Sequence, residues 1–293
     1  MKPPPFAYAR AATLGEALAL VAEAGDEAKL LAGGQSLLPL LSYRLARPTH
    51  LVDIGRLPGL DGIDPSGGGL AIGGLARHAA VERSAGLAGP WRAVREAAAL
   101  IGHLPIRERG TFGGSIAHAD PSAELPVVAL ALDAAFVLRS AAGMRTVPAA
   151  EFFTGPFMTV IDPAEVLVRA EFPAPPPGLR SAFEEFTARS GDFALVSAAV
   201  ALAPGEDGAA RHVRIALGSV GPVPVRAREA EASLDGAALT PDAAAAAARI
   251  AAAEAEPGED AFAGAAFRRD LVAALVERAL TRLIDETDEG GRP

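Results

Sequence analysis

Two short glycine-rich stretches hold the residues best suited to chemistry in this sequence. In one of them, Gly110, Gly113 and Gly114 fall within five positions, with the hydroxyls of Thr111 and Ser115 beside them. Glycines at this density let backbone N–H groups converge on one point, because no Cβ blocks the approach or forbids positive φ. Amides and hydroxyls arranged in this way bind anions. A plain glycine-rich turn between two elements is the alternative interpretation of a single such stretch.

The other stretch lies near the start of the chain and has the same character. It pairs Gly33 and Gly34 with the hydroxyl of Ser36, and it follows a short apolar segment at 28–31. We call residues 32–37 the first glycine loop and residues 110–115 the second glycine loop. One loop of this kind suits one phosphate, and two suit a diphosphate, so the pair favours a dinucleotide ligand.

Local signals predict the elements that must position these loops. The segment 13–16 is a capping box that begins a helix, and residues 28–31 are predicted to form the buried strand that leads into the first glycine loop. Ser122 or Asp120 is expected to cap a helix that runs through Leu132, directly after the second loop. Each loop is therefore expected beside a helix N-terminus, which favours anions.

Composition limits the function further. The chain has 293 residues and a formal net charge of −9, which argues against a nucleic-acid partner. It has no cysteine, so it holds no disulfide and no thiolate-bound iron–sulfur cluster, and its five scattered histidines predict no metal site. It lacks the roughly 18-residue apolar run of a membrane span, and residues 1–5 are no signal core. We therefore expect a cytoplasmic protein.

The chain also lacks the sequence signatures of a catalytic centre. It has no phosphate-binding P-loop, no nucleophile elbow and no evident pair of nucleophile and base. Two anion-binding loops without such groups are typical of a protein that holds a cofactor, and the cofactor then supplies the reactivity. We predict no catalytic residue in this chain.

A proline-rich segment indicates a domain boundary. Residues 173–178 contain four prolines in six positions. We predict an α+β protein with one domain over 1–175, divided into parts at about 1–55 and 56–175, a second domain over 179–285 and a tail over 286–293. The second domain is expected to contain a three-stranded antiparallel sheet over 181–188, 194–203 and 212–218, followed by helices over 226–234, 241–253 and 267–284.

Taken together in this order and separation, the two loops carry a family resemblance. The sequence resembles the FAD-binding medium subunit of the molybdenum hydroxylases, the carbon monoxide dehydrogenase and xanthine dehydrogenase family. The resemblance extends over nearly the whole chain and includes the segments 50–54, 189–194 and 214–218. It implies a two-part FAD-binding domain of the vanillyl-alcohol oxidase or p-cresol methylhydroxylase type, followed by the C-terminal domain of the CO dehydrogenase flavoprotein.

The resemblance also implies a function and partners. Such a subunit carries FAD, takes electrons from 2Fe-2S clusters of a small partner subunit and passes them to an external acceptor. A large partner subunit with the molybdenum cofactor oxidises the substrate, and the complex is a dimer of heterotrimers. Two alternatives stay open: a stand-alone flavin oxidase, and a non-redox nucleotide-binding assembly module.

Carried over by position, the resemblance implies a set of FAD-binding residues. Glu124 matches an acidic position near the ribityl chain or ring, although it also suits the first turn of a helix. Leu167 matches an apolar residue that packs on the ring, and Tyr43 or Phe193 is interpreted as a ring shield or as core. The remaining positions are Ala32, Gly33, Gly34, Gln35, Ser36, Leu37, Thr111, Phe112, Gly113, Gly114 and Ser115.

The sequence departs from the family pattern in three places. Glu108 stands where the family usually has asparagine, and Phe112 is bulkier than the usual isoleucine or leucine. Glu184 and Glu185 occupy the region where a lysine often contacts the flavin. An acidic pair there would disfavour an anionic reduced flavin.

Overall fold

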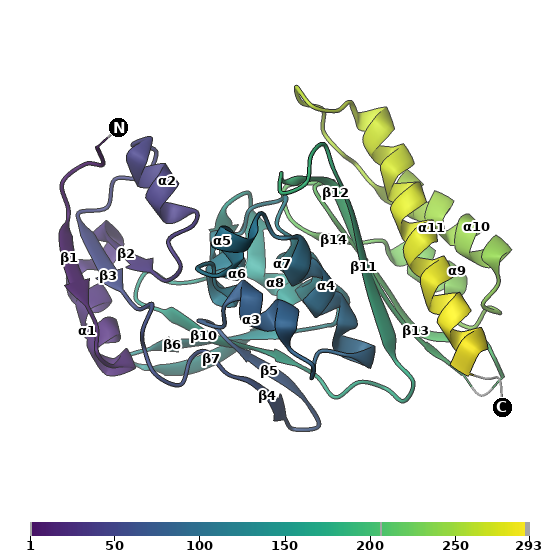
Figure 1. Ribbon diagram of the computed structural model, residues 1–293, viewed down its shortest axis with the longest axis horizontal. Coiled ribbons are helices and arrows are strands. Elements are labelled where there is room, and N and C mark those ends of the chain that lie inside the picture. Colours follow the sequence, from purple (N-terminus) through teal and green to yellow (C-terminus); the bar gives the residue numbers. More distant parts are fainter. Residues whose placement is uncertain (1, 206, 291–293) are drawn as a thin grey trace.

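The computed structural model describes residues 2–205 and 207–290, and its three parts follow one another along the long axis of the molecule (Figure 1). The first part is a parallel sheet in the order β1-β3-β2, with two helices. Their bounds are β1 (Ala7–Arg10), β2 (Ala28–Leu31), β3 (His50–Asp53), α1 (Leu14–Ala24) and α2 (Leu37–Ser42). The predicted capping box is confirmed, because the Glu16 amide donates to Thr13 Oγ1 at 3.1 Å and the Glu16 carboxylate accepts from the Ala12 amide.

The second part, over residues 56–175, is a five-stranded antiparallel sheet with short helices on one side. The strands are β4 (Ile63–Ser66), β5 (Gly69–Gly73), β10 (Val166–Phe172), β6 (Ala135–Ser140) and β7 (Gly143–Pro148), in that order across the sheet. The helices are α3 (His78–Arg83), α4 (Arg92–Leu100), α5 (Leu104–Arg107), α6 (Phe112–His118), α7 (Glu124–Ala131) and α8 (Ala149–Phe152), and a small hairpin joins β8 (Phe153–Gly155) to β9 (Met158–Thr159).

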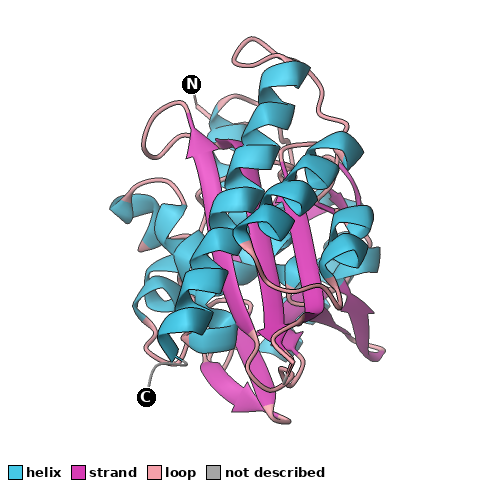
Figure 2. Ribbon diagram, turned by 90° about the vertical axis from the view of Figure 1, so that its right-hand side faces the viewer, coloured by secondary structure: helices cyan, strands magenta, loops and turns pink. Residues whose placement is uncertain are grey.

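The C-terminal part is an antiparallel sheet covered by three helices (Figure 2). Its strands are β11 (Arg180–Thr187), β12 (Ala194–Pro204), β13 (Ala210–Gly218) and β14 (Val225–Arg226), and its helices are α9 (Arg228–Leu234), α10 (Pro241–Glu254) and α11 (Ala265–Gly290). The predicted three-stranded sheet was therefore one strand short. Residues 225–226 were missed because a strand of two residues has no periodicity, and 226 was assigned to the following helix instead.

Two expectations about helix ends were also wrong. The second loop itself leads into α6, and the helix expected to run through Leu132 is α7, which begins at Glu124. Its N-cap Ala123 provides no side-chain cap, and the Asp120 carboxylate instead accepts from the Ser122 amide at 2.9 Å. The tail expected over 286–293 is helical as far as Gly290, and residues 291–293 lie outside the described part of the chain. Within the described residues, no helix combines the length and apolarity that crossing a membrane requires.

The C-terminal sheet is buried on both faces, which joins the two domains. Along β11, Phe183 belongs to the core that contains Val94 of α4 and Val127 of α7, whereas Ala182 packs with Leu275 of α11. Successive residues of a strand point to opposite faces of its sheet, so odd-numbered residues of β11 face the first domain and even-numbered residues face α11.

Candidate functional site

The structure brings the two glycine loops into contact. A Cβ placed on Gly33 would lie 2.8 Å from Gly110 Cα and closer still to the Arg109 carbonyl oxygen. Residue 33 must therefore be glycine for the backbones to approach this closely. The adjacency of the two loops, predicted from their residue types alone, is confirmed.

The first glycine loop offers free hydrogen-bond donors. It follows β2 at the carboxyl ends of the parallel strands, where α/β sheets bind ligands. Within the described residues, the backbone N–H groups of Gly33, Gly34, Gln35 and Ser36 donate to no protein acceptor. Gly34 has a φ of 74°, which turns the chain at this point. The loop therefore has the donors that an anion requires.

The second glycine loop does not offer a comparable set of amides, which corrects the sequence-based expectation. The Phe112 amide donates to Ala76 O at 2.8 Å and the Gly113 amide to Gly74 O at 2.9 Å. The Gly114 and Ser115 amides both donate to Thr111, whose hydroxyl caps α6. The Phe112 and Gly113 amides fix the loop on residues 74–76, and the Gly114 and Ser115 amides are used within the first turn of α6. The second loop therefore contributes fewer free amides than the first.

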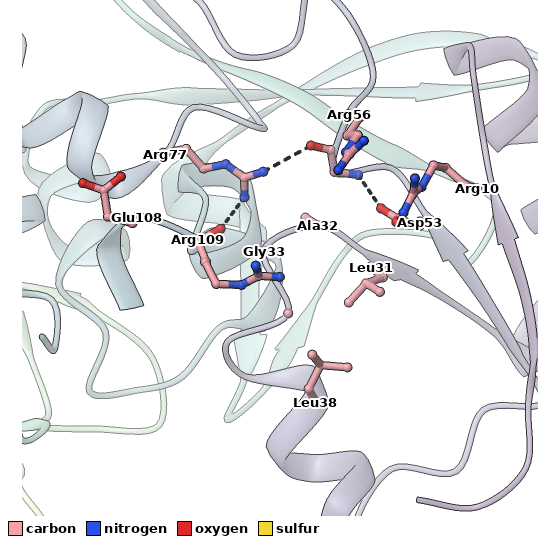
Figure 3. Close-up of a pocket in the computed structure, with 12 residues that line it drawn as sticks. Arg10, Leu31, Ala32, Gly33, Leu38, Asp53, Arg56, Arg77, Glu108 and Arg109 are labelled. Atoms are coloured by element: carbon pink, nitrogen blue, oxygen red, sulfur yellow. Dashed lines mark hydrogen bonds and ion pairs between the residues drawn. The ribbon is translucent and has the colours of Figure 1, made fainter. Parts of the chain in front are cut away.

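Arg77 links the two parts of the first domain (Figure 3). Its Nη1 donates to the Arg109 carbonyl in the second-loop region, and its Nη2 donates to Gly55 O, in the turn after β3, at 3.1 Å. Burial and the neighbouring Arg109 charge lower the pKa of the Arg77 guanidinium. This partly buried guanidinium, which donates to two carbonyls, therefore fixes the turn after β3 relative to the segment that leads into the second glycine loop.

A cavity of about 250 Å³ lies where the two loops meet, and it is rich in arginine (Figure 3). Arg10, Arg56, Arg77 and Arg109 line it, and Arg10 is paired with Asp53 at 3.2 Å. In the part of the chain that the structure describes, Arg56 and Arg109 form no ion pair, so they are available to an anion. Sequence analysis missed these arginines, because single arginines after strands and in turns carry no local signal.

The donor set of this cavity fits a diphosphate. Free amides come from the first loop, and positive charge comes from Arg56 and Arg109. Charge-assisted hydrogen bonds of this kind are about twice as strong as neutral ones. The site can therefore hold the doubly charged centre of a dinucleotide.

A second cavity, of about 580 Å³, lies on the other side of α5 between the two domains. Leu100, Leu104 and His103 form its wall in the first domain, and Glu185 and Gly191 form its wall in the second. A Cβ on Gly191 would collide with the His103 ring, so these two walls touch. Its size and apolar residues suit an aromatic ring system.

The remaining predicted site residues differ in where they lie. Glu124 begins α7 and is 6% exposed, and burial raises its pKa to about 8. Leu167 is buried in β10, and the Phe112 ring lies in the core at 6.3 Å from the Phe172 ring. The interpretation of Tyr43 and Phe193 as core residues was wrong, because they are 69% and 67% exposed.

Glu184 and Glu185 do not act as one acidic pair, because they lie on opposite faces of β11. The Glu184 carboxylate is paired with Arg278 at 2.7 Å and with Arg282, both on α11. Glu185 faces the first domain. Glu108 points to Arg83, with which it forms an exposed ion pair at 2.6 Å. Both Glu184 and Glu185 line the second cavity, but the Glu184 carboxylate is neutralised by arginines of α11, whereas Glu185 forms no ion pair within the described residues.

Fold and site together define a two-domain protein that binds an anionic dinucleotide, and comparison with known proteins gives the family. A model described as the FAD binding domain in molybdopterin dehydrogenase matches residues 4–175. A second, described as the CO dehydrogenase flavoprotein C-terminal domain, matches residues 181–283. The chain belongs to the FAD-binding medium subunits of the molybdopterin dehydrogenases, of the CO dehydrogenase and xanthine dehydrogenase type.

Individual relatives are similar over almost their full length. The chain is 42% identical over 284 residues to the 6-hydroxypseudooxynicotine dehydrogenase complex subunit alpha of Paenarthrobacter nicotinovorans, covering 97% of this chain and 96% of that protein. It superposes with a TM-score of 0.91 and 41% identity on a chain of carbon monoxide dehydrogenase from Hydrogenophaga pseudoflava, over 96% and 98% of the two chains. Quinoline 2-oxidoreductase from Pseudomonas putida 86 gives a TM-score of 0.91 at 36% identity, over 98% and 99%.

Proposed function

We propose that this chain is the FAD-carrying electron-transfer subunit of a molybdenum hydroxylase. The observation that carries the proposal is the contact between two glycine loops beside an arginine-lined cavity, in a chain of this family. Bound FAD supplies the redox chemistry, and the protein contributes binding, orientation and electrostatics.

The two cavities suggest how the cofactor lies. The diphosphate occupies the first cavity, where it accepts hydrogen bonds from the amides of the first glycine loop and from Arg56 and Arg109. The ring system occupies the second cavity, across α5, where Leu100 and Leu104 exclude water. The predicted residues from Ala32 to Leu37 and from Thr111 to Ser115, with Glu124 and Leu167, then divide into two roles. The first loop contacts the cofactor, and most of the second loop supports it.

Partners follow from the family and from the relatives. We propose a complex with a small subunit that holds 2Fe-2S clusters and a large subunit that holds the molybdenum cofactor, assembled as a dimer of heterotrimers in the cytoplasm. Electrons then pass from the clusters to FAD and on to an external acceptor. The first domain, residues 1–175, binds the cofactor. The second domain, residues 179–285, closes over the flavin ring.

Purification tests the proposal. When it is co-expressed with the genes adjacent to its own, the chain should co-purify with an iron–sulfur protein and a molybdenum protein. The purified complex should also show flavin absorbance that corresponds to one FAD per chain. The isolated chain should be reduced by its iron–sulfur partner and not directly by the substrate. Reduction by substrate without partners would indicate a stand-alone oxidase, and a protein without flavin would indicate an assembly module; either result overturns the proposal.

A further inference from the structure

Three polar side chains meet at the seam between the domains, and two of them carry a buried atom with no hydrogen-bond partner among the described residues. Glu185 of β11 lies directly opposite Ser197 of β12, so both side chains are on the sheet face that meets the first domain. Glu185 Oε2 and Ser197 Oγ are both buried without a hydrogen-bond partner in the described residues. Buried polar atoms are nearly always paired, so orphaned ones call for a specific explanation.

The third member of this cluster is Glu124, which reaches the same face from α7. Val127, one turn further along α7, lies against Gly218, because a Cβ on Gly218 would be 2.5 Å from Val127 Cγ2 and would also collide with Ser197 Oγ. Residues three apart share a helix face, so Glu124 and Val127 both point to this sheet. Glu124 is 6% exposed, and the charge of Glu185 acts on it.

No cation neutralises the two carboxyl groups. Within the described residues, neither Glu124 nor Glu185 forms an ion pair. Arg107 lines the same cavity as Glu185, but it is paired with Glu82 at 2.8 Å and donates to two backbone carbonyls. The carboxylate of Asp120, in the loop before α7, adds a further negative charge.

Two neighbouring carboxyl groups, Glu124 buried and Glu185 half-buried, that have no counter-ion cannot both be ionised at neutral pH, so the pair retains a proton. Burial raises the pKa of Glu124 to about 8 and that of Glu185 to about 7. The pair therefore holds a labile proton near neutrality, in contact with the second cavity through Glu185. Such tuning is typical of groups that transfer protons.

We propose that Glu124 and Glu185 form a proton-holding pair that donates a proton to the cofactor when it is reduced and is reprotonated from solvent through the second cavity. The inference rests on the proposed function, which places the flavin ring in that cavity. Reduction of FAD to FADH2 requires two electrons and two protons. The electrons come one at a time from a one-electron donor centre of a partner. One proton is the proton that the pair holds, and it passes to the cofactor through Glu185, the member that lines the second cavity. The pair then takes a proton from water, and the other proton of the cofactor comes directly from water.

Infrared difference spectroscopy on the full chain loaded with FAD tests this inference, with dithionite as reductant. In spectra resolved in time after mixing, we expect reduction to remove transiently a carboxylic acid C=O band that shifts in D2O, because the pair gives up its proton to the cofactor before it regains one from solvent. The band should be absent in Glu124→Gln and shifted in Glu185→Gln. The control Glu229→Gln removes an exposed carboxyl group of α9 that lines neither cavity, and it should keep the band.

The outcomes separate this inference from the proposed function. A chain that binds no FAD overturns both. A chain that binds and reduces FAD while no carboxylic acid band changes overturns the proton-holding pair alone. The oxidised protein provides an independent measurement, because a protonated carboxyl should be visible at pH 6.5 in the wild type and missing in Glu124→Gln. Its absence from the wild-type spectrum also overturns the inference.

Discussion

Replacing Gly33 by alanine should open the contact between the two glycine loops. The new Cβ would lie 2.8 Å from Gly110 Cα and closer still to the Arg109 carbonyl oxygen, and an ordinary contact begins at 3.4 Å, so the loops must separate by at least about 0.6 Å. Both obstacles are backbone, which cannot rotate away as a side chain can. Binding sites tolerate displacements of about 0.5 Å, so the shift should break one or two charge-assisted hydrogen bonds to the diphosphate. Each contributes about 1.5–3 kcal/mol, which predicts a loss of FAD affinity of roughly tenfold or more.

Titration of the apoprotein with FAD, followed by quenching of flavin fluorescence, measures this affinity. Urea unfolding of the same apoprotein shows whether the variant is folded. Gly15→Ala is the matched control, because its Cβ meets only Thr13 Oγ1 at 3.9 Å. It should leave FAD affinity unchanged and stabilise α1 by roughly 0.5–1 kcal/mol. A Gly33→Ala variant that binds FAD as tightly as the wild type would refute the contact between the loops as the basis of the site.

Three further variants test the surrounding structure. Arg77→Met removes the donors to two carbonyls, so it should lower the unfolding free energy by about 1–3 kcal/mol and should also weaken FAD binding. The control Arg83→Met removes an exposed ion pair and should lower the unfolding free energy by less than about 1 kcal/mol. Gly113→Ala places a Cβ 2.7 Å from the Gly74 backbone and should destabilise the chain by about 1–3 kcal/mol in urea unfolding. The raised pKa of Glu124 means that the folded state binds its proton more tightly than the unfolded state, so stability should fall as pH rises. A folded-state pKa of about 8, against the usual 4.5, predicts that the unfolding free energy falls by about 2 kcal/mol between pH 6.5 and 8.5, and that this fall is absent in Glu124→Gln. Equal pH dependence of stability in the two proteins would contradict the burial of Glu124.

Local sequence signals determined the features that depend on neighbouring residues alone. The capping box at 13–16 forms because its partners are three residues apart, and the first glycine loop follows its strand because Gly34 permits positive φ. The two loops and their order also sufficed to identify the family. These inferences succeeded because each depends on residues that are adjacent in the chain.

Only the tertiary structure decided which groups face a ligand. From the sequence, the second loop has the same amide donors as the first, yet Gly74 and Ala76, far away in sequence, accept its hydrogen bonds. Arg77 acquires its role from carbonyls at 55 and 109, and Glu185 acquires its buried acidic neighbour from α7. Hydrogen-bond capacity is a property of each residue, but whether that capacity is already used within the fold depends on which distant segments pack against it.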